Sequence, residues 1–202
     1  MYTVNFFRWS GVANILGGLL LAISLFVHPE EVHTPQNLGS GAWAIAHILA
    51  MVATLIVLLG LPGLYIRQMN ETGRLGGIGF VLTFIGTACV FALNWSDGFV
   101  VPLVATLAPD FITAVFTTEA GKTLFLVVAI SVVTFALGWL LLGIAIFRGR
   151  VLARWASLPA MLGALLLVFS EGMPLPVLWT GGTLFGLGLV WLGVSLFNQA
   201  TN

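Results

Sequence analysis

His47 has the clearest potential for chemistry in this chain, because it is an imidazole inside a long apolar run. A titratable group at membrane depth is costly and marks a candidate functional site by default. Three roles are open for His47. The first is a neutral imidazole hydrogen-bonded to a neighbouring helix. The second is a ligand, either to a metal ion, to a haem iron or to a chlorin magnesium. The third is a group that handles a proton or a substrate.

Four other polar residues, His28, Asn94, Asp97 and Glu171, stand at the ends of neighbouring apolar runs. Because successive runs cross a membrane in alternating directions, we expect these ends to meet on the outer side, in one pocket around His47. His47 and His28 are the candidate cofactor ligands, and His47, His28, Asp97 and Glu171 are the candidate ligands of a divalent metal. A bis-histidine haem requires His28 to bend inward, whereas a chlorin requires one axial ligand.

The loop that follows the first run combines imidazole and carboxylate groups in the order His28-x-Glu30-Glu31-x-His33. These ligand types suit zinc, but their spacing matches no established zinc motif. A solvated acidic loop is the alternative interpretation. Cys89 is the single cysteine, which excludes a disulfide framework and a cysteine-based metal site.

Other chemistries lack their sequence signals. The chain has no nucleophile elbow, no phosphate-binding Gly-Lys loop and no His-Glu-x-x-His motif. One lysine and six arginines cannot form the basic face that nucleic-acid binding requires. The sequence therefore predicts no catalytic residues and no nucleic-acid partner.

The elements that position His47 follow from composition: of 202 residues, 59% are apolar and 7% are charged. A soluble domain carries roughly a quarter charged residues, so we expect a membrane protein with the lipid bilayer as its surroundings. A crossing takes about 20 helical residues. The sequence predicts an all-α fold, a single transmembrane domain over 1–202, with six spans at about residues 6–27, 42–65, 75–95, 122–147, 153–171 and 176–197.

The third span is ambiguous at its outer end. A single helix over 75–107 would be about 50 Å long, which exceeds the hydrocarbon thickness of a bilayer. We expect a kink or break near Gly98 or Pro102, with the segment at about 98–121 in the outer interface. A short helix with a proline at its start is expected within 110–121.

Charge predicts the orientation. If the first run is a crossing that starts in the cytoplasm, six of the seven basic residues lie inside, and only Lys122 lies outside with six of the seven carboxylates. The positive-inside rule therefore predicts that both termini are cytoplasmic. The six inner arginines are Arg8, Arg67, Arg74, Arg148, Arg150 and Arg154, and the outer carboxylates are Glu30, Glu31, Asp97, Asp110, Glu119 and Glu171.

Glycine and tryptophan predict how the spans pack. Small residues let helices approach closely in lipid, and the spans contain candidates such as Gly18, Gly79, Gly138 and Gly186. Tryptophans near the span ends are typical interface anchors. These are Trp9, Trp43, Trp95, Trp155 and Trp179.

Three segments carry a resemblance. They are Trp43-x-x-x-His47, the run Leu-Gly-Leu-Pro-Gly-Leu-Tyr at 59–65, and Gly-Arg-Leu-Gly at 73–76, with a looser likeness at 135–141. With these segments the chain resembles a family of small bacterial polytopic membrane proteins to which no activity is assigned. The resemblance implies the bacterial inner membrane and a bundle of about six helices.

Three functions compete. The first is a non-catalytic accessory or structural subunit of a larger inner-membrane assembly, with other membrane subunits as partners, because the spans contain few polar groups. The second is a cofactor- or metal-binding protein that uses His47 at the outer leaflet. The third is a small transporter, which a broken helix and a polar site at the midplane would mark.

Overall fold

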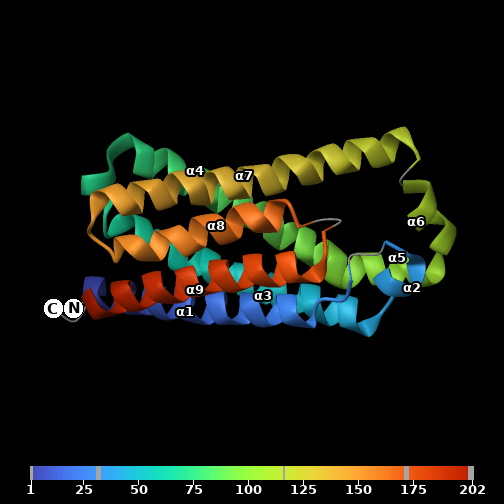
Figure 1. Ribbon diagram of the computed structural model, residues 1–202, viewed down its shortest axis with the longest axis horizontal. Helices are drawn as coiled ribbons and strands as arrows, with labels where there is room; N and C mark the ends of the chain where they lie inside the picture. Colours follow the sequence, from blue (N-terminus) through green and yellow to red (C-terminus); the bar gives the residue numbers. More distant parts are fainter. Residues whose placement is uncertain (1, 31–32, 116, 171–172, 200–202) are drawn as a thin grey trace.

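The computed structural model describes residues 2–30, 33–115, 117–170 and 173–199, and within these residues the protein is helical and has no strand (Figure 1). Five helices are long and apolar enough to cross a membrane. The long helices are α1 (Tyr2–Val27), α3 (Gly41–Ile66), α4 (Met69–Trp95), α7 (Glu119–Gly149) and α9 (Leu175–Gln199). The shorter ones are α2 (Pro35–Leu38), η1 (Ser96–Val100), α5 (Val101–Leu107), α6 (Pro109–Val115), η2 (Arg154–Ala156) and α8 (Ser157–Val168).

Five of the six predicted spans are confirmed as long apolar helices. The remaining one, predicted at 153–171, is different. The apolar run at 153–171 forms only η2 and α8, which together cover Arg154–Val168 and are too short to count as a span by length. Both ends of the run are used in tight turns. The Ala156 amide donates to Ala153 O at its start, and the Phe169 amide donates to Leu166 O at its end.

Gly73 breaks the start of α4 with a left-handed φ of 55°, close to the predicted start of the third span, and beyond it the chain remains helical to Leu107, which makes the span longer than expected. The expected irregularity near Gly98 is present as the π-helical turn η1, in which the Val101 amide donates to Ser96 O. Pro102 lacks an amide hydrogen and its ring would crowd the carbonyl one turn earlier, and the wider π turn relieves this conflict. The helix therefore deforms without breaking.

The segment at 98–121, predicted as one interfacial stretch, is three different elements. Residues 98–107 extend the third helix through η1 and α5. The expected short helix with a proline start is α6, which begins at Pro109 and ends at Val115. Residues 119–121 already belong to α7, where the Thr118 side chain accepts a hydrogen bond from the Gly121 amide and caps the helix.

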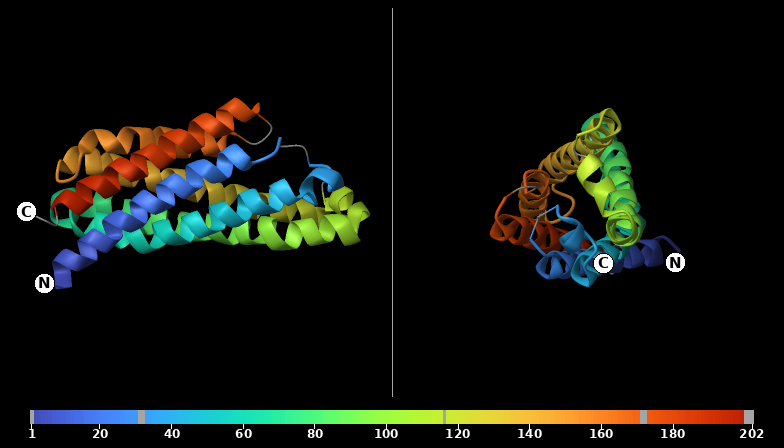
Figure 2. Two further views of the ribbon diagram at one scale, coloured as in Figure 1. Left: turned by 90° about the horizontal axis from the view of Figure 1, so that it is seen from below. Right: turned by 90° about the vertical axis from the view of Figure 1, so that its right-hand side faces the viewer.

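The six helices α1, α3, α4, α7, α8 and α9 form a closed ring in chain order. Each packs against the next in antiparallel fashion, and α9 returns to pack against α1 (Figure 1; Figure 2 shows the ring along its axis at right). Helix α8 starts beside the end of α7 and stops short of the far end of the ring.

Glycines allow the closest helix contacts of this ring, as predicted. A Cβ atom on Gly18 of α1 would lie 2.6 Å from Gly186 O of α9, and one on Gly79 of α4 would lie 2.6 Å from the Leu142 amide nitrogen of α7. Such distances are shorter than real carbon contacts, so a side chain at either position would push the two helices apart.

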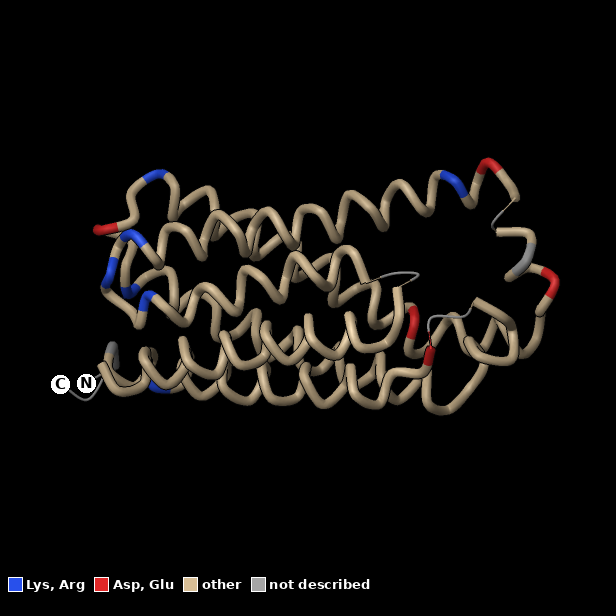
Figure 3. The backbone as a smooth tube through the Cα atoms, in the orientation of Figure 1, with Lys and Arg blue, Asp and Glu red and all other residues tan. Residues whose placement is uncertain are grey.

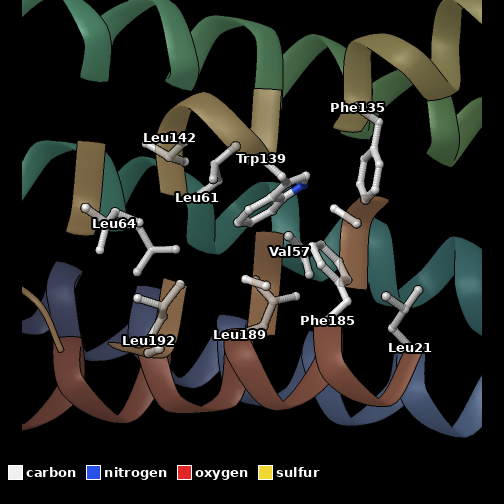
Figure 4. Close-up of a cluster of buried hydrophobic side chains, with 14 of the residues drawn as sticks. Leu21, Val57, Leu61, Leu64, Phe135, Trp139, Leu142, Phe185, Leu189 and Leu192 are labelled. Carbon is white, nitrogen blue, oxygen red and sulfur yellow. The ribbon is translucent and has the colours of Figure 1, made fainter. Parts of the chain in front are cut away.

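Large apolar side chains fill the centre of the ring (Figure 4). Trp139 packs edge-to-face on Phe185, with ring centroids 5.0 Å apart. Leu61, Leu142 and Leu189 close the space beside them and have no exposed surface. Helices α3, α7 and α9 therefore meet across the ring in a packed apolar core.

The charges separate to the two ends of the bundle, as predicted (Figure 3). We call the basic end the one where α1 and α4 begin and α3, α7 and α9 end; it carries the arginines and both chain termini. The acidic end is opposite and carries the described carboxylates except Glu71, together with Lys122. Glu31 and Glu171 lie outside the described residues.

Candidate functional site

Three of the four predicted site residues meet at the acidic end of the bundle. His28 directly follows α1, His47 lies in the second turn of α3, and Asp97 lies in η1. The fourth residue, Glu171, is outside the described residues. Trp43 completes the group, and we call His28, Trp43, His47 and Asp97 the acidic-end cluster.

The start of α3 positions two of these side chains. Ser40 accepts a hydrogen bond from the Trp43 amide (3.2 Å) and so fixes where the helix begins. Trp43 and His47 are four residues apart, on the same face of the helix. Their ring centroids are 4.5 Å apart, so the indole covers the imidazole.

The contact between α3 and η1 brings Asp97 to His47. The indole Nε1 of Trp43 donates to the backbone oxygen of Asp97 (3.1 Å). Asp97 Oδ2 lies 3.7 Å from His47 Nε2, and the His47 side chain is 12% exposed. Gly98 permits this approach, because a Cβ atom there would lie 3.0 Å from Ile48 Cγ1. The π turn η1 thus places the Asp97 carboxylate beside the mostly buried imidazole of His47.

The hydrogen bonds of the imidazoles assign their protons. His47 Nδ1 lies 3.0 Å from Trp43 O, and His28 Nδ1 lies 2.7 Å from Pro29 O. A carbonyl oxygen only accepts, so each Nδ1 carries a hydrogen and donates it. In the neutral ring, Nε2 then has no hydrogen and carries a lone pair. The lone pair of His47 Nε2 faces the Asp97 carboxylate. A proton or a cation between the two atoms turns this contact into an attraction.

His28 is buried against the same group. Its ring centroid lies 4.9 Å from that of His47 and 5.1 Å from that of Trp43. Burial lowers the pKa of His28 below its usual value of 6.5, the bond to Pro29 opposes that shift, and the nearby charge of His33 adds to it. His28 is therefore held neutral near pH 7.

The ring distances bear on which cofactors fit. Among the described residues, no group of three or more His, Cys, Asp or Glu side chains is arranged to hold a metal ion. The rings of His28 and His47 touch edge to face, which leaves no space for a porphyrin between them as a bis-histidine haem requires. A chlorin with His47 as its axial ligand would have to displace the Asp97 carboxylate from Nε2.

One expectation about a neighbouring residue needs correction. Trp43, expected as an interface anchor, is only 4% exposed and belongs to the cluster. Its spacing of four residues from His47 is the sequence signal for this role. Asn94 donates to Val90 O (2.8 Å) of its own helix, and its place in a pocket around His47 stays a prediction. His33 contacts the outer side of the cluster, with its ring 6.2 Å from that of Trp43.

The fold and the cluster together define the class of the protein. Its described residues form an all-helical fold with five helices long and apolar enough to cross a membrane, and with an imidazole–carboxylate cluster at one end. No family model matches the chain, and neither a curated protein nor a solved structure does. Its function is therefore inferred from the arrangement of its own residues.

Proposed function

We propose that this protein is a non-catalytic accessory subunit of a larger assembly in the bacterial inner membrane. In this proposal both termini are cytoplasmic, since the six arginines gather at the end that carries the termini. The chain makes its remaining crossing between the end of α7 and the start of α9, and the short α8 forms only part of that crossing, because α8 leaves the basic end and α9 returns to it (Figure 1). A reporter enzyme that is active only in the cytoplasm should therefore be active when it is fused to either terminus.

The packed centre of the ring is the observation that carries the proposal. Trp139, Leu142 and Leu189 meet there and are almost completely buried. Transporters place polar groups of broken helices at the midplane, and a channel needs a wettable path. The side chains that fill the described part of the ring at that depth are mostly apolar, and the buried Asn14 and Thr83 donate to carbonyls of their own helices, which favours a binding role over transport.

The partner surface that we propose is the outer half of α7, residues 119–134. Helix α7 has 31 residues, about 46 Å of helix, and extends past the end of α8. Leu126 and Ile130 are 60% and 58% exposed on this segment. Helix α4 accompanies α7, but among the described residues no helix of the ring covers its other side beyond α8. A partner's transmembrane helix is the proposed cover.

Site-directed crosslinking in the native membrane tests this surface. A photoreactive amino acid at 126 should capture a protein partner in a product of one defined mass. The matched control is position 59, because Leu59 of α3 is 67% exposed and lies away from α7. Crosslinking to lipid alone at both positions would overturn the proposed surface.

Cofactor or metal binding is the second candidate, and the acidic-end cluster favours it. His47 Nε2 and Asp97 Oδ2 face each other at 3.7 Å, a separation that one bound cation would bridge. Gently solubilised protein should then contain a stoichiometric divalent metal, or show a chlorin absorption band, that His47→Ala removes. Protein free of both would reject this candidate and leave the accessory role untouched.

A further inference from the structure

A cavity of about 160 Å³ lies inside the ring, between the packed centre and the acidic end. All six ring helices contribute to its wall, which is mostly hydrocarbon from side chains such as Leu21, Ala50, Val90 and Phe135. A dry cavity of this size with apolar walls holds a benzene-sized molecule. Its volume therefore suits a six-carbon ring.

Three polar side chains line the cavity, and the donors of Thr54 and Asn94 are bonded to carbonyls of their own helices, so the hydroxyl of Thr87 is the one that stands out. Threonines in these helices donate to the carbonyl one turn earlier, as Thr54 does to Ala50 O (2.9 Å) and Thr83 does to Gly79 O (2.7 Å). Thr87 lines the cavity, is 1% exposed, and its Oγ1 has no hydrogen-bond partner among the described residues. A buried hydroxyl without a partner costs about 1–3 kcal/mol, so an acceptor in the cavity would satisfy it.

The wall of the cavity is partly exposed at the end of α8. Val132 of α7 and Leu167 and Val168 of α8 line it and are partly exposed, as are Val90 and Asn94 of α4, whereas Ala50 and Val57 are buried. Helix α8 stops at Val168 while α7 continues beyond it. The apolar side chains at the end of α8 suit the entry of a molecule that is dissolved in lipid.

We propose that this cavity binds a small lipid-soluble carbonyl compound of the cyclic ketone class, whose oxygen accepts a hydrogen bond from Thr87 Oγ1. A carbonyl oxygen accepts the Thr87 hydrogen and brings no hydrogen of its own, so this one bond satisfies both groups. The site is separate from the acidic-end cluster, and it borders the proposed partner surface at Val132 of α7. It goes beyond the proposed accessory role and does not depend on it.

The test uses the full chain in nanodiscs of phosphatidylcholine with two fluorinated probes. One probe is 4,4-difluorocyclohexanone, and the other is 1,1-difluorocyclohexane, which has the same ring without the carbonyl. Saturable binding is followed by the fluorine resonance of the bound probe. We expect both probes to bind, the ketone about fivefold more tightly, which is the ratio that one net hydrogen bond gives.

Matched variants separate the hydrogen bond from the space. Thr87→Val should remove the preference for the ketone and leave the hydrocarbon unchanged, and Thr87→Ser should keep the preference. Thr134→Val is the control, because the Thr134 hydroxyl donates to Ile130 O (2.7 Å) and does not line the cavity. Ala50→Leu should abolish binding of both probes by filling the cavity. Ala92→Leu, at an exposed position of α4, should not.

Three results would overturn the proposal. They are the absence of saturable binding to the wild-type protein, binding that survives Ala50→Leu, and equal affinity of the wild-type protein for the two probes. A variant that fails to fold would show a changed helical circular dichroism. In that case the Thr87→Ser and Thr87→Val pair decides, because both substitutions preserve the volume of the side chain to within about one methyl group.

Discussion

Asp97 Oδ2 lies 3.7 Å from His47 Nε2, and the same residue accepts a hydrogen bond at its backbone oxygen from the Trp43 indole. The two contacts hold η1 against the start of α3 through both the main chain and the side chain of one residue. The π turn, the start of α3 and the buried imidazole therefore act as one structural unit, and its parts can be tested separately.

The indole hydrogen bond is the first part. Trp43→Phe keeps an aromatic ring over His47 but removes the donor to Asp97 O, so we expect a loss of about 1 kcal/mol in the free energy of unfolding. Trp43→Ala also leaves a cavity, with an expected loss of about 3–5 kcal/mol. Denaturant unfolding in mild micelles measures both. Trp95→Phe is the control, since Trp95 is half exposed, and an equal loss there would reject the assigned role.

The carboxylate is the second part. Asp97→Asn replaces an acceptor by an amide whose nitrogen can donate to the His47 Nε2 lone pair, so we expect a change of less than about 1 kcal/mol in stability. Asp97→Leu cannot donate and should lower stability by about 1–3 kcal/mol. The same unfolding experiment compares the two. Equal losses for both variants would contradict the assignment of the Nδ1 hydrogen.

Acid should weaken the acidic end through His28. Its pKa is lowered in the folded protein by burial, so the unfolded chain binds more protons below its usual pKa of 6.5. Stability contributed by the neutral ring is complete above that value and falls as the pH drops below it. Unfolding measured from pH 8 to pH 5 should show this decline. His28→Gln should flatten the curve, and a curve of unchanged slope would argue against His28.

Close glycine contacts should control the stability of the ring. A Cβ atom on Gly138 of α7 would fall among the backbone atoms of Thr83 on α4, whereas one on Gly77 would meet only Tyr65 Oη at 3.5 Å. Gly138→Ala should therefore lower the free energy of unfolding by about 1–3 kcal/mol. Gly77→Ala, on α4 but facing Tyr65 of α3, should change it by less than about 0.5 kcal/mol. Similar effects at both positions would contradict the observed packing.

Hydropathy predicts most of this fold, because a helix that crosses lipid must be long, apolar and internally hydrogen-bonded. It is weaker where length is marginal: the run at 153–171 contains enough apolar residues for a span, but its ends are taken by turns around Ala156 and Phe169. The π turn depends on how the missing amide of Pro102 is accommodated, and hydropathy does not contain that information.

The acidic-end cluster was only partly predictable. Alternating directions of the helices are enough to bring His28, His47 and Asp97 to one end. The role of Trp43 follows from which face of α3 meets η1, and a tryptophan at a span end is equally typical of an interface anchor. The cavity beside Thr87 arises from the packing of six helices, so no local pattern in the sequence announces it.

The size of the particle that contains this chain tests the accessory role most directly. Native membranes solubilised in a mild detergent should release the tagged 21.5 kDa chain in a larger complex on a native gel. Leu126→Trp with Ile130→Trp should release it as a monomer, and Leu59→Trp should not. A wild-type chain that migrates as a lone monomer, under conditions that preserve other membrane complexes, would contradict the proposed function.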